Sequence, residues 1–190
     1  MSKKYKYPLP EYKNRNLISC NEDEIRIILR GADAIVTQGG RNLLSLILKG
    51  SNSQDILKYD LQKCPSYGAF SHLRLEEVLG RIDWVIRNDY LMLDIRGRLP
   101  VLIFAPRGWE MYKRIYAQEL LSLLQAELSV EIIIEKLLNT HSEIKFLLIS
   151  MIKEKFNNQW VPILKLWQMG EVRKIKEAIE EILISNNQPS

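Results

Sequence analysis

Residues 90–105 read YLMLDIRGRLPVLIFA, and this stretch decides the fold. Two runs rich in Leu, Ile and Val, Tyr90 to Ile95 and Leu99 to Ala105, predict β-strands. Between them lies Arg96-Gly97-Arg98, in which the glycine can supply the unusual backbone angle of a tight turn. The stretch therefore predicts a β-hairpin, and the flanking sequence indicates what kind of domain carries it.

The sequence on the N-terminal side of the hairpin predicts helices. Asn21 suits an N-cap position, and the acids at 22–24 suit the first turn, where the helix dipole favours negative charge. Gly31 is expected to end this helix or to follow it closely. Helices followed by a hairpin are the order of a winged helix. The predicted helices are Asn21 to about Gly31, Arg41 to Lys49, a short helix capped by Ser51 or Ser53, and about Leu73 to Asn88.

The sequence on the C-terminal side of the hairpin predicts only helices. Pro106 is expected to open the first of them, because proline fits the first helical turn. Thr140-His141-Ser142-Glu143 matches a capping box. The last four predicted helices form two pairs of similar length, and the second pair consists of Trp160 to Trp167 and Val172 to Ile184. Two such pairs indicate stacked helical hairpins of HEAT type. We therefore expect a mostly α fold with a β-hairpin wing: a winged helix followed by an α-helical, HEAT-like region.

Pattern and charge divide the chain into four predicted parts. They are a basic flexible arm (1–20), a winged-helix domain (21–110), an α-helical domain (111–185) and a disordered tail (186–190). The arm carries five Lys or Arg and one acid, residues 40–109 carry ten and seven, and residues 110–190 carry ten and eleven. Positive charge in the front half of the chain points to a polyanion as the partner of that half.

Several functional classes are disfavoured by what the sequence lacks. No apolar run reaches the length of a membrane span, and the start has no apolar core of a secretory signal, so we expect a cytoplasmic, nucleoid-associated protein without a membrane partner. The two cysteines and two histidines are scattered, so neither a metal site nor a cofactor is expected. Lys49-Gly50-Ser51 reverses the order of a phosphate-binding loop, and no nucleophile elbow occurs. We expect no enzyme.

Three phrases of the front half resemble a known domain when they are taken together. They are GGRNLLSLILKGS at 39–51, CPSYG at 64–68 and RLPVLIFAPRGW at 98–109. Over about Asn21 to Glu110 the chain resembles the RQC domain, the winged helix that follows the helicase core in RecQ helicases. It is similar above all to the short bacterial RQC-minor proteins that have no helicase. The sequence differs from a RecQ helicase in having no motor domain, no zinc-binding Cys cluster and no aromatic residue at the hairpin turn.

The resemblance implies a set of DNA contacts at helix starts and at the hairpin turn. These positions carry hydroxyl, imidazole or guanidinium groups that can reach a phosphate. An aromatic residue at the turn stacks on bases in RecQ proteins that pry base pairs apart, so this chain is expected to bind without unwinding. The implied DNA-binding residues are Arg41, Ser51, Ser53, Ser71, His72, Arg74, Arg96 and Arg98.

Structural roles remain as alternatives for several of these residues. Ser51 or Ser53 is at least as well explained as an N-cap, and Arg74 as a partner of Glu77 on the same helix. Tyr67 is expected to pack under its loop, and Trp84 and Trp109 are expected in the core.

The leading hypothesis is a non-enzymatic protein that binds duplex, forked or quadruplex DNA through the phosphate backbone. The alternatives are an adaptor that binds a protein partner through helices 111–185, and a winged-helix transcription regulator.

Overall fold

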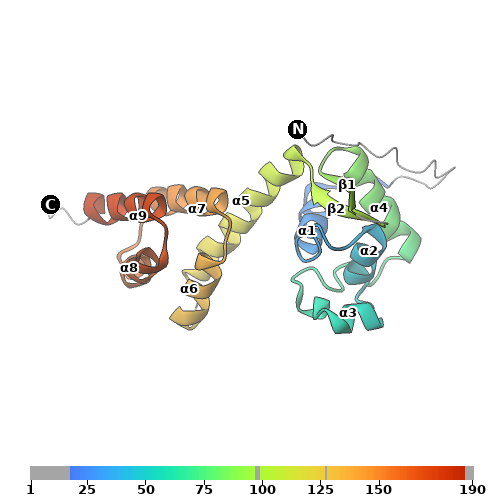
Figure 1. The fold of residues 1–190 in the computed structure, drawn as a ribbon, viewed down its shortest axis with the longest axis horizontal. Helices are drawn as coiled ribbons and strands as arrows, with labels where there is room; N and C mark the ends of the chain where they lie inside the picture. The colour runs from blue at the N-terminus through green and yellow to red at the C-terminus, as the bar shows by residue number, and fades with distance from the viewer. Residues whose placement is uncertain (1–17, 97–98, 127, 187–190) are drawn as a thin grey trace. The chain divides into compact units, whose positions relative to one another are not determined.

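A computed structural model describes residues 18–96, 99–126 and 128–186 (Figure 1). The chain forms two compact units that meet between Tyr112 and Lys113. This boundary lies inside one long helix, α5 (Pro106–Leu123). No helix of the described part is long and apolar enough to cross a membrane. Each unit is described by itself below.

The first unit has the predicted order of helices followed by a hairpin (Figure 1). Asn21 caps α1, since its side chain accepts the Glu24 amide at 2.9 Å while Glu24 accepts the Asn21 amide at 3.0 Å. Gly50, in the left-handed region with φ of 71°, ends α2 as expected. The elements are α1 (Glu22–Asp33), α2 (Arg41–Lys49), α3 (Gln54–Lys58), the 3-10 turn η1 (Leu61–Lys63), α4 (Leu75–Arg87), β1 (Leu91–Arg96) and β2 (Leu99–Phe104).

The hairpin pairs β1 with β2 in antiparallel register, with Leu91 opposite Phe104 and Arg96 opposite Leu99. The segment before α2 extends this pairing, because the Thr37 amide donates to Leu102 O at 2.9 Å and the Leu102 amide donates to Gly39 O at 2.8 Å. No pattern in the sequence indicated that this turn segment, in which Thr37 has φ of 67°, pairs with the hairpin. It ties the wing to the start of α2 and completes the winged helix.

Gly31 has a different role from the one expected. The helix does not end there but continues to Asp33, and Gly31 is buried within it. A Cβ at this position would lie 3.1 Å from a methyl group of Leu44 and 3.1 Å from one of Leu48. The glycine is therefore a site of close packing between α1 and α2, and the prediction that it ends the helix is wrong.

The junction between the hairpin and α5 is also tightly packed. Pro106 opens α5 as predicted. A Cβ on Gly108 would fall 1.8 Å from the carbonyl oxygen of Tyr90, so only glycine fits. Trp109 stacks on Tyr112 with ring centroids 5.8 Å apart and also contacts Phe104. Trp109 is thus part of an aromatic cluster, but it is only partly buried and does not belong to the core as expected.

The second unit is entirely helical in its described part. Besides the end of α5, it contains α6 (Val130–Leu138), α7 (Ser142–Glu154), the 3-10 turn η2 (Asn158–Trp160), α8 (Val161–Gly170) and α9 (Arg173–Asn186). In this unit α6 packs on α8, α7 packs on α9, and α8 packs on α9 (Figure 1). The predicted fold class, a winged helix followed by an α-helical region, is confirmed, although only α8 and α9 form a closely packed hairpin of the HEAT-like kind among the described residues.

The start of α7 differs in one detail from the predicted capping box. His141, not Thr140, is the N-cap, and its Nδ1 accepts the Glu143 amide at 3.3 Å. The Thr140 hydroxyl instead donates to Lys136 O at 2.7 Å and so belongs to the end of α6.

A buried polar cluster joins α6, α7 and α8 of this unit. The Glu171 carboxylate accepts the indole N–H of Trp167 at 2.7 Å and forms an ion pair with Lys145 of α7. Lys145 also donates to Leu138 O, at the end of α6, at 2.9 Å. The side chains of Lys145 and Glu171 are 7% and 3% exposed, so each charge depends on the other.

Candidate nucleic-acid interface

Helix α4 precedes the wing, and only its two ends carry fully exposed side chains. Its middle is mostly buried, including Asp83, while Arg81 and Trp84 are partly exposed. Arg74 and Leu75, at its start, are exposed. The helix can therefore present its N-terminal end to a ligand, but not its whole length. An end-on approach suits a phosphate, because the first amides of a helix have no intrahelical acceptor.

The turn that leads into α4 is held by a lysine. Lys49, the last residue of α2, donates from Nζ to the carbonyl oxygen of Ser71 at 2.7 Å and also to that of Leu73. These bonds fix the turn while the side chains of Ser71 and His72 remain exposed. Lys49 is a positioning residue that the sequence did not reveal, since nothing local links it to a turn 22 residues away.

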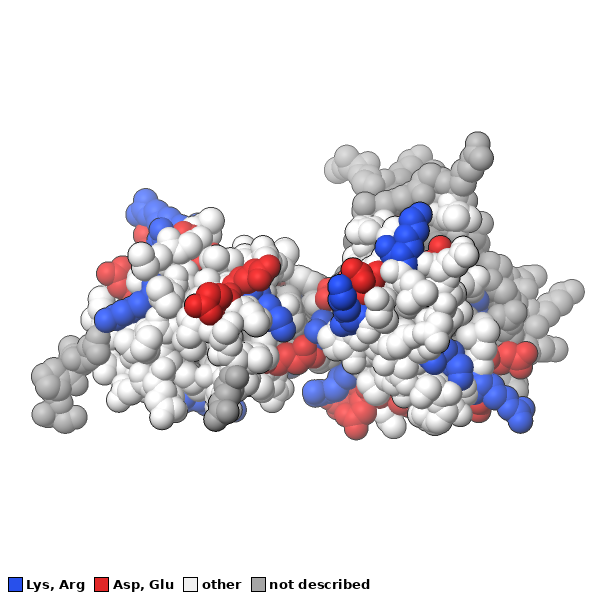
Figure 2. All heavy atoms as spheres, turned by 90° about the horizontal axis from the view of Figure 1, so that it is seen from below, with Lys and Arg blue, Asp and Glu red and all other residues white. Residues whose placement is uncertain are grey.

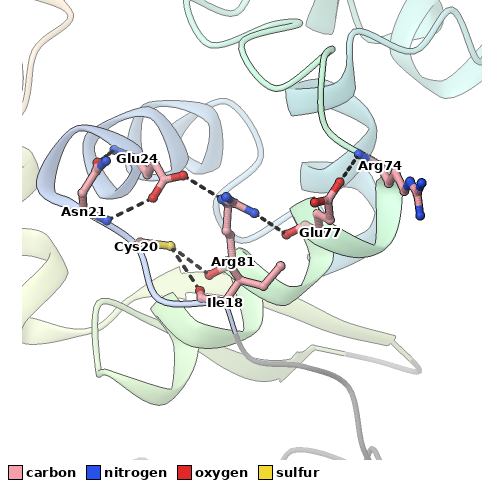
Figure 3. Close-up of polar contacts among 7 residues, drawn as sticks. All are labelled: Ile18, Cys20, Asn21, Glu24, Arg74, Glu77 and Arg81. Carbon is pink, nitrogen blue, oxygen red and sulfur yellow. Dashed lines mark hydrogen bonds and ion pairs between the residues drawn. The ribbon is translucent and has the colours of Figure 1, made fainter.

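Arg74 is the N-cap residue of α4, and its guanidinium is not held by Glu77. The Glu77 carboxylate accepts the backbone N–H of Arg74 at 2.7 Å, and the guanidinium points away from it (Figure 3). Among the described residues no acid pairs with the Arg74 side chain. The alternative that Arg74 serves an ion pair with Glu77 is therefore not supported, and its charge faces solvent.

The side chain of the neighbouring cation on α4 is held by an ion pair, unlike that of Arg74. Arg81 donates from Nε to Glu24 at 2.7 Å and from Nη1 to Glu77 O at 3.3 Å (Figure 3). Glu24 also closes the capping box with Asn21. This network ties the start of α1 to the first half of α4, and it leaves Arg74 as the solvent-facing charge of the two arginines.

Cys20 lies at the edge of this network. Its Sγ is 3.6 Å from Arg81 O and 3.8 Å from Ile18 O (Figure 3). Burial, and then the nearby Glu24 charge, raise the pKa of the Cys20 thiol to about 12. The thiol therefore stays protonated at neutral pH and is a poor nucleophile.

The structure places Ser51 and Ser53 in the turn before α3. The Ser51 hydroxyl accepts the Ser53 amide at 3.2 Å, and the phenol of Tyr67 donates to Ser51 O at 3.1 Å. Ser53 is the N-cap residue by position, although its Oγ is buried and bonds to no other described atom. Helix α3 has five residues, so its dipole is small. These contacts favour the structural alternative, and Tyr67 packs under its loop as expected.

Two glycines stabilise this turn, because their backbones approach each other closely. Gly50 and Gly68 both have φ of 71°, and a Cβ on Gly50 would lie 3.0 Å from the Cα of Gly68. The close approach lets the Gly68 amide donate to Ile47 O at 2.9 Å. Residues 49–51 and 66–68 therefore lie next to each other, which joins the end of α2 to the loop before α4.

Arg41 does not lie on the surface. Its guanidinium forms a two-pronged ion pair with Asp83 of α4, in which Nη2 is 2.8 Å from Oδ2 and Nε contacts Oδ1. The two side chains are 8% and 7% exposed. This placement argues against a DNA contact by Arg41, because a phosphate would have to displace a buried carboxylate. Its role is to join α2 to α4.

The structure describes only part of the two wing arginines, Arg96 and Arg98. The backbone of Arg96 ends β1, but its side chain and all of Arg98 lie outside the described residues. The sequence-based expectation for both therefore stays a prediction. The first described residue beyond the turn, Leu99, has 74% of its surface exposed.

The charged surface contains no large region of one sign in the view of Figure 2. Basic and acidic side chains alternate among broader uncharged areas. Any phosphate contact of this face must therefore rest on individual donors. Within the described ranges, no group of three His, Cys, Asp or Glu side chains could hold a metal ion.

One known protein family matches this part of the chain. The RQC domain family matches residues 22–125, which is more than half of the chain. The chain belongs to the RQC domain family. The RQC domain is the DNA-binding winged helix of RecQ helicases, a binding and not a catalytic domain. The match covers the first unit from α1 onward and all of α5. Neither the curated proteins nor the solved structures contain a match to this chain.

Proposed function

We propose that residues 21–110 form a domain that binds DNA through the phosphate backbone and does not separate its strands. The observation that carries the proposal is the exposed group of Ser71, His72 and Arg74 at the start of α4, in a domain of a DNA-binding family. The group combines within four positions a hydroxyl, an imidazole and a guanidinium that pairs with no acid of the described part of the chain. Such donors suit phosphate oxygens and carry no direct base specificity.

The physical basis of the proposed binding is a preformed end of a 13-residue helix. The dipole of α4 favours an anion at this end, whereas Glu76 and Glu77 of the first turn oppose one, so the attraction rests on the Arg74 guanidinium. Lys49 holds the preceding turn before any ligand arrives, so little conformational entropy is lost on binding. The buried middle of α4 disfavours insertion of the helix along a major groove, which supports backbone contacts over base reading.

The wing is proposed to add backbone contacts without acting as a wedge. Arg96 and Arg98 flank the turn and offer two further cations, while the turn sequence RGR has no aromatic ring to stack on a base. No sequence motif of a motor or a nucleophile accompanies them. We therefore propose a non-enzymatic binding protein, for which duplex, forked and quadruplex DNA are all candidate ligands.

The test is a titration of the full chain with duplex, forked, single-stranded and quadruplex DNA at several salt concentrations. Arg74→Gln is compared with Arg87→Gln, which removes the same charge from the exposed, unpaired arginine at the other end of α4. Loss of one phosphate contact should flatten the slope of log K against log salt by about 0.9 for duplex DNA. We expect this change for Arg74→Gln at every sequence tested, and no such change for Arg87→Gln.

Three results would contradict the proposal. They are the absence of binding at low salt, equal effects of the two substitutions, and separation of a fluorophore-labelled fork by the protein alone. A strong preference for one duplex over its scrambled versions would instead favour the transcription-regulator alternative.

A further inference from the structure

Helix α8 of the second unit uses one side to form the core. Trp160, Leu164 and Trp167 lie on that side at helical spacing, and each has at most 2% of its surface exposed. Glu171 continues the same side and holds the buried ion pair with Lys145. At 100° per residue, these four positions fall within one narrow sector of the helix. The inner side of α8 is therefore fully accounted for by packing within the unit.

The opposite side of α8 is also apolar, although it faces solvent. Pro162, Leu166 and Met169 follow the i, i+4, i+7 pattern and fall within about 60° of each other on a helical wheel, pointing away from the core. Leu166 is 47% exposed and Met169 75% exposed. Val172, 64% exposed, follows at the turn into α9. We call Pro162, Leu166, Met169 and Val172 the outer seam of α8.

A helix that is apolar on two opposite sides normally has both of them covered. Single exposed apolar residues are common on protein surfaces, but a row of them at helical spacing marks an interaction site. Within the described part of this unit nothing covers Met169 or Val172, which are the most exposed apolar side chains there. The seam is narrow and straight, and a row spaced i, i+4, i+7 is complementary to the apolar stripe of another helix.

The charges beside the seam indicate the chemistry of that helix. Lys165 precedes Leu166 and lies one turn from Met169, while Lys174 follows Val172 in the first turn of α9; both are exposed. Neither forms an ion pair with a described residue, whereas the nearby Arg173 is paired with Glu177 at 2.7 Å. Of the two acids nearest to Lys174 in the sequence, Glu171 is buried and paired with Lys145, and Glu177 is the partner of Arg173. The rim of the seam is therefore basic, and its counter-charges come from elsewhere.

We propose that the outer seam of α8 binds an amphipathic helix of another protein, with an apolar stripe flanked by Asp or Glu. A second copy of the same seam is a poor occupant, because it would bring Lys165 and Lys174 against equal charges. DNA would use the lysines but would leave the apolar row in water. This inference concerns the second unit and does not depend on the DNA-binding proposal.

The test is a selection of helical peptides of about 18 residues, long enough to be helical in water, from a displayed library against the full chain. Duplex DNA is present throughout as a competitor. We expect enriched peptides with apolar residues at i, i+3 or i+4 and i+7, and with acids beside them. Their affinity is then measured by fluorescence anisotropy for Leu166→Glu and Met169→Glu. The matched control is Ile184→Glu, a change of another apolar residue, 61% exposed on α9 and outside the seam.

The two seam variants should weaken peptide binding at least tenfold, and the control should leave it unchanged. Lys165→Glu should weaken the acidic peptide and favour a version in which Lys replaces its Glu residues. Because every altered side chain is exposed, thermal melting should stay close to that of the parent chain.

The inference is overturned if no peptide is enriched, if enriched peptides are basic, or if they bind Met169→Glu as well as the parent. It is also overturned if ultracentrifugation shows a dimer that Met169→Glu abolishes, which would assign the seam to a second copy. Loss of DNA affinity in Met169→Glu would assign it to nucleic acid. The DNA-binding proposal is tested separately, by Arg74→Gln.

Discussion

Replacing Arg41 by alanine should destabilise the first unit strongly while leaving the DNA affinity of folded protein unchanged. The guanidinium and the Asp83 carboxylate are buried against each other between α2 and α4, with 8% and 7% of their side-chain surfaces exposed. Two bonds join them, one of them 2.8 Å long. Alanine would remove both bonds and leave the carboxylate buried without its counter-charge.

The magnitude follows from the cost of that orphaned charge. Removing one partner of a buried ion pair costs about 3 to 5 kcal/mol, compared with about 0 to 1 kcal/mol for an exposed pair. Domains are stable by only about 5 to 15 kcal/mol, so the loss is a large part of the total. In contrast, Arg26→Ala removes an exposed pair with Glu22 and should change stability by less than about 1 kcal/mol.

The assay is chemical denaturation of the full chain, followed by far-ultraviolet circular dichroism and by tryptophan fluorescence, to which Trp84 and Trp109 of the first unit contribute alongside the two tryptophans of the second. The double variant Arg41→Met with Asp83→Leu is the decisive control. Replacing both charges by apolar side chains of similar volume is often neutral or stabilising. The double variant should therefore recover most of the stability lost in Arg41→Ala. DNA titration of the double variant then separates folding from binding.

Two results would refute this reasoning. A loss below about 1 kcal/mol in Arg41→Ala would mean that Asp83 is not left uncompensated. A stable double variant with a flatter salt dependence of DNA binding would mean that Arg41 contacts phosphate, and that the ion pair opens when DNA binds.

Gly108→Ala should destabilise the protein by about 3 kcal/mol or more in denaturant unfolding, although alanine normally stabilises a helix. The reason is that the added Cβ would fall 1.8 Å from Tyr90 O. A stabilised variant would show that α5 can shift freely. In a Cys64→Ala background, Cys20 should react with iodoacetamide with an apparent pKa well above 9, toward 12, because burial holds its thiol protonated. Since the pKa of this thiol is raised in the folded state, its contribution to the stability of the fold is present below pH 9 and is lost as the pH rises toward 12. Equal reactivity of the folded and the denatured protein would contradict this prediction.

Local sequence patterns predicted most of the elements of this chain. The hairpin expected at 90–95 and 99–105 lies at Leu91–Arg96 and Leu99–Phe104, because strand propensity and a turn glycine act over a few residues. Caps act over a similar range, so Asn21 was placed correctly. Gly31 was not, because its role depends on Leu44 and Leu48 of another helix.

The candidate site was predicted in part. Family resemblance pointed to Ser71, His72 and Arg74, and the structure shows all three exposed at the start of α4, although their contact with DNA stays a prediction. The same resemblance pointed to Arg41, which is buried. Lys49, which holds the turn before α4, was missed because its partners are 22 and 24 residues away.

The sequence by itself determined the type and order of the elements, the family and the surplus of cations in the front half. Only the tertiary structure decided which of those cations meet solvent. Arg41 and Asp83 are 42 residues apart, and Arg81 and Glu24 are 57 apart. No short-range pattern encodes such pairs, since burial and charge pairing depend on which surfaces the packed helices bring together. The folded chain thereby neutralises Arg41 and Arg81 and leaves the charge of Arg74 facing solvent.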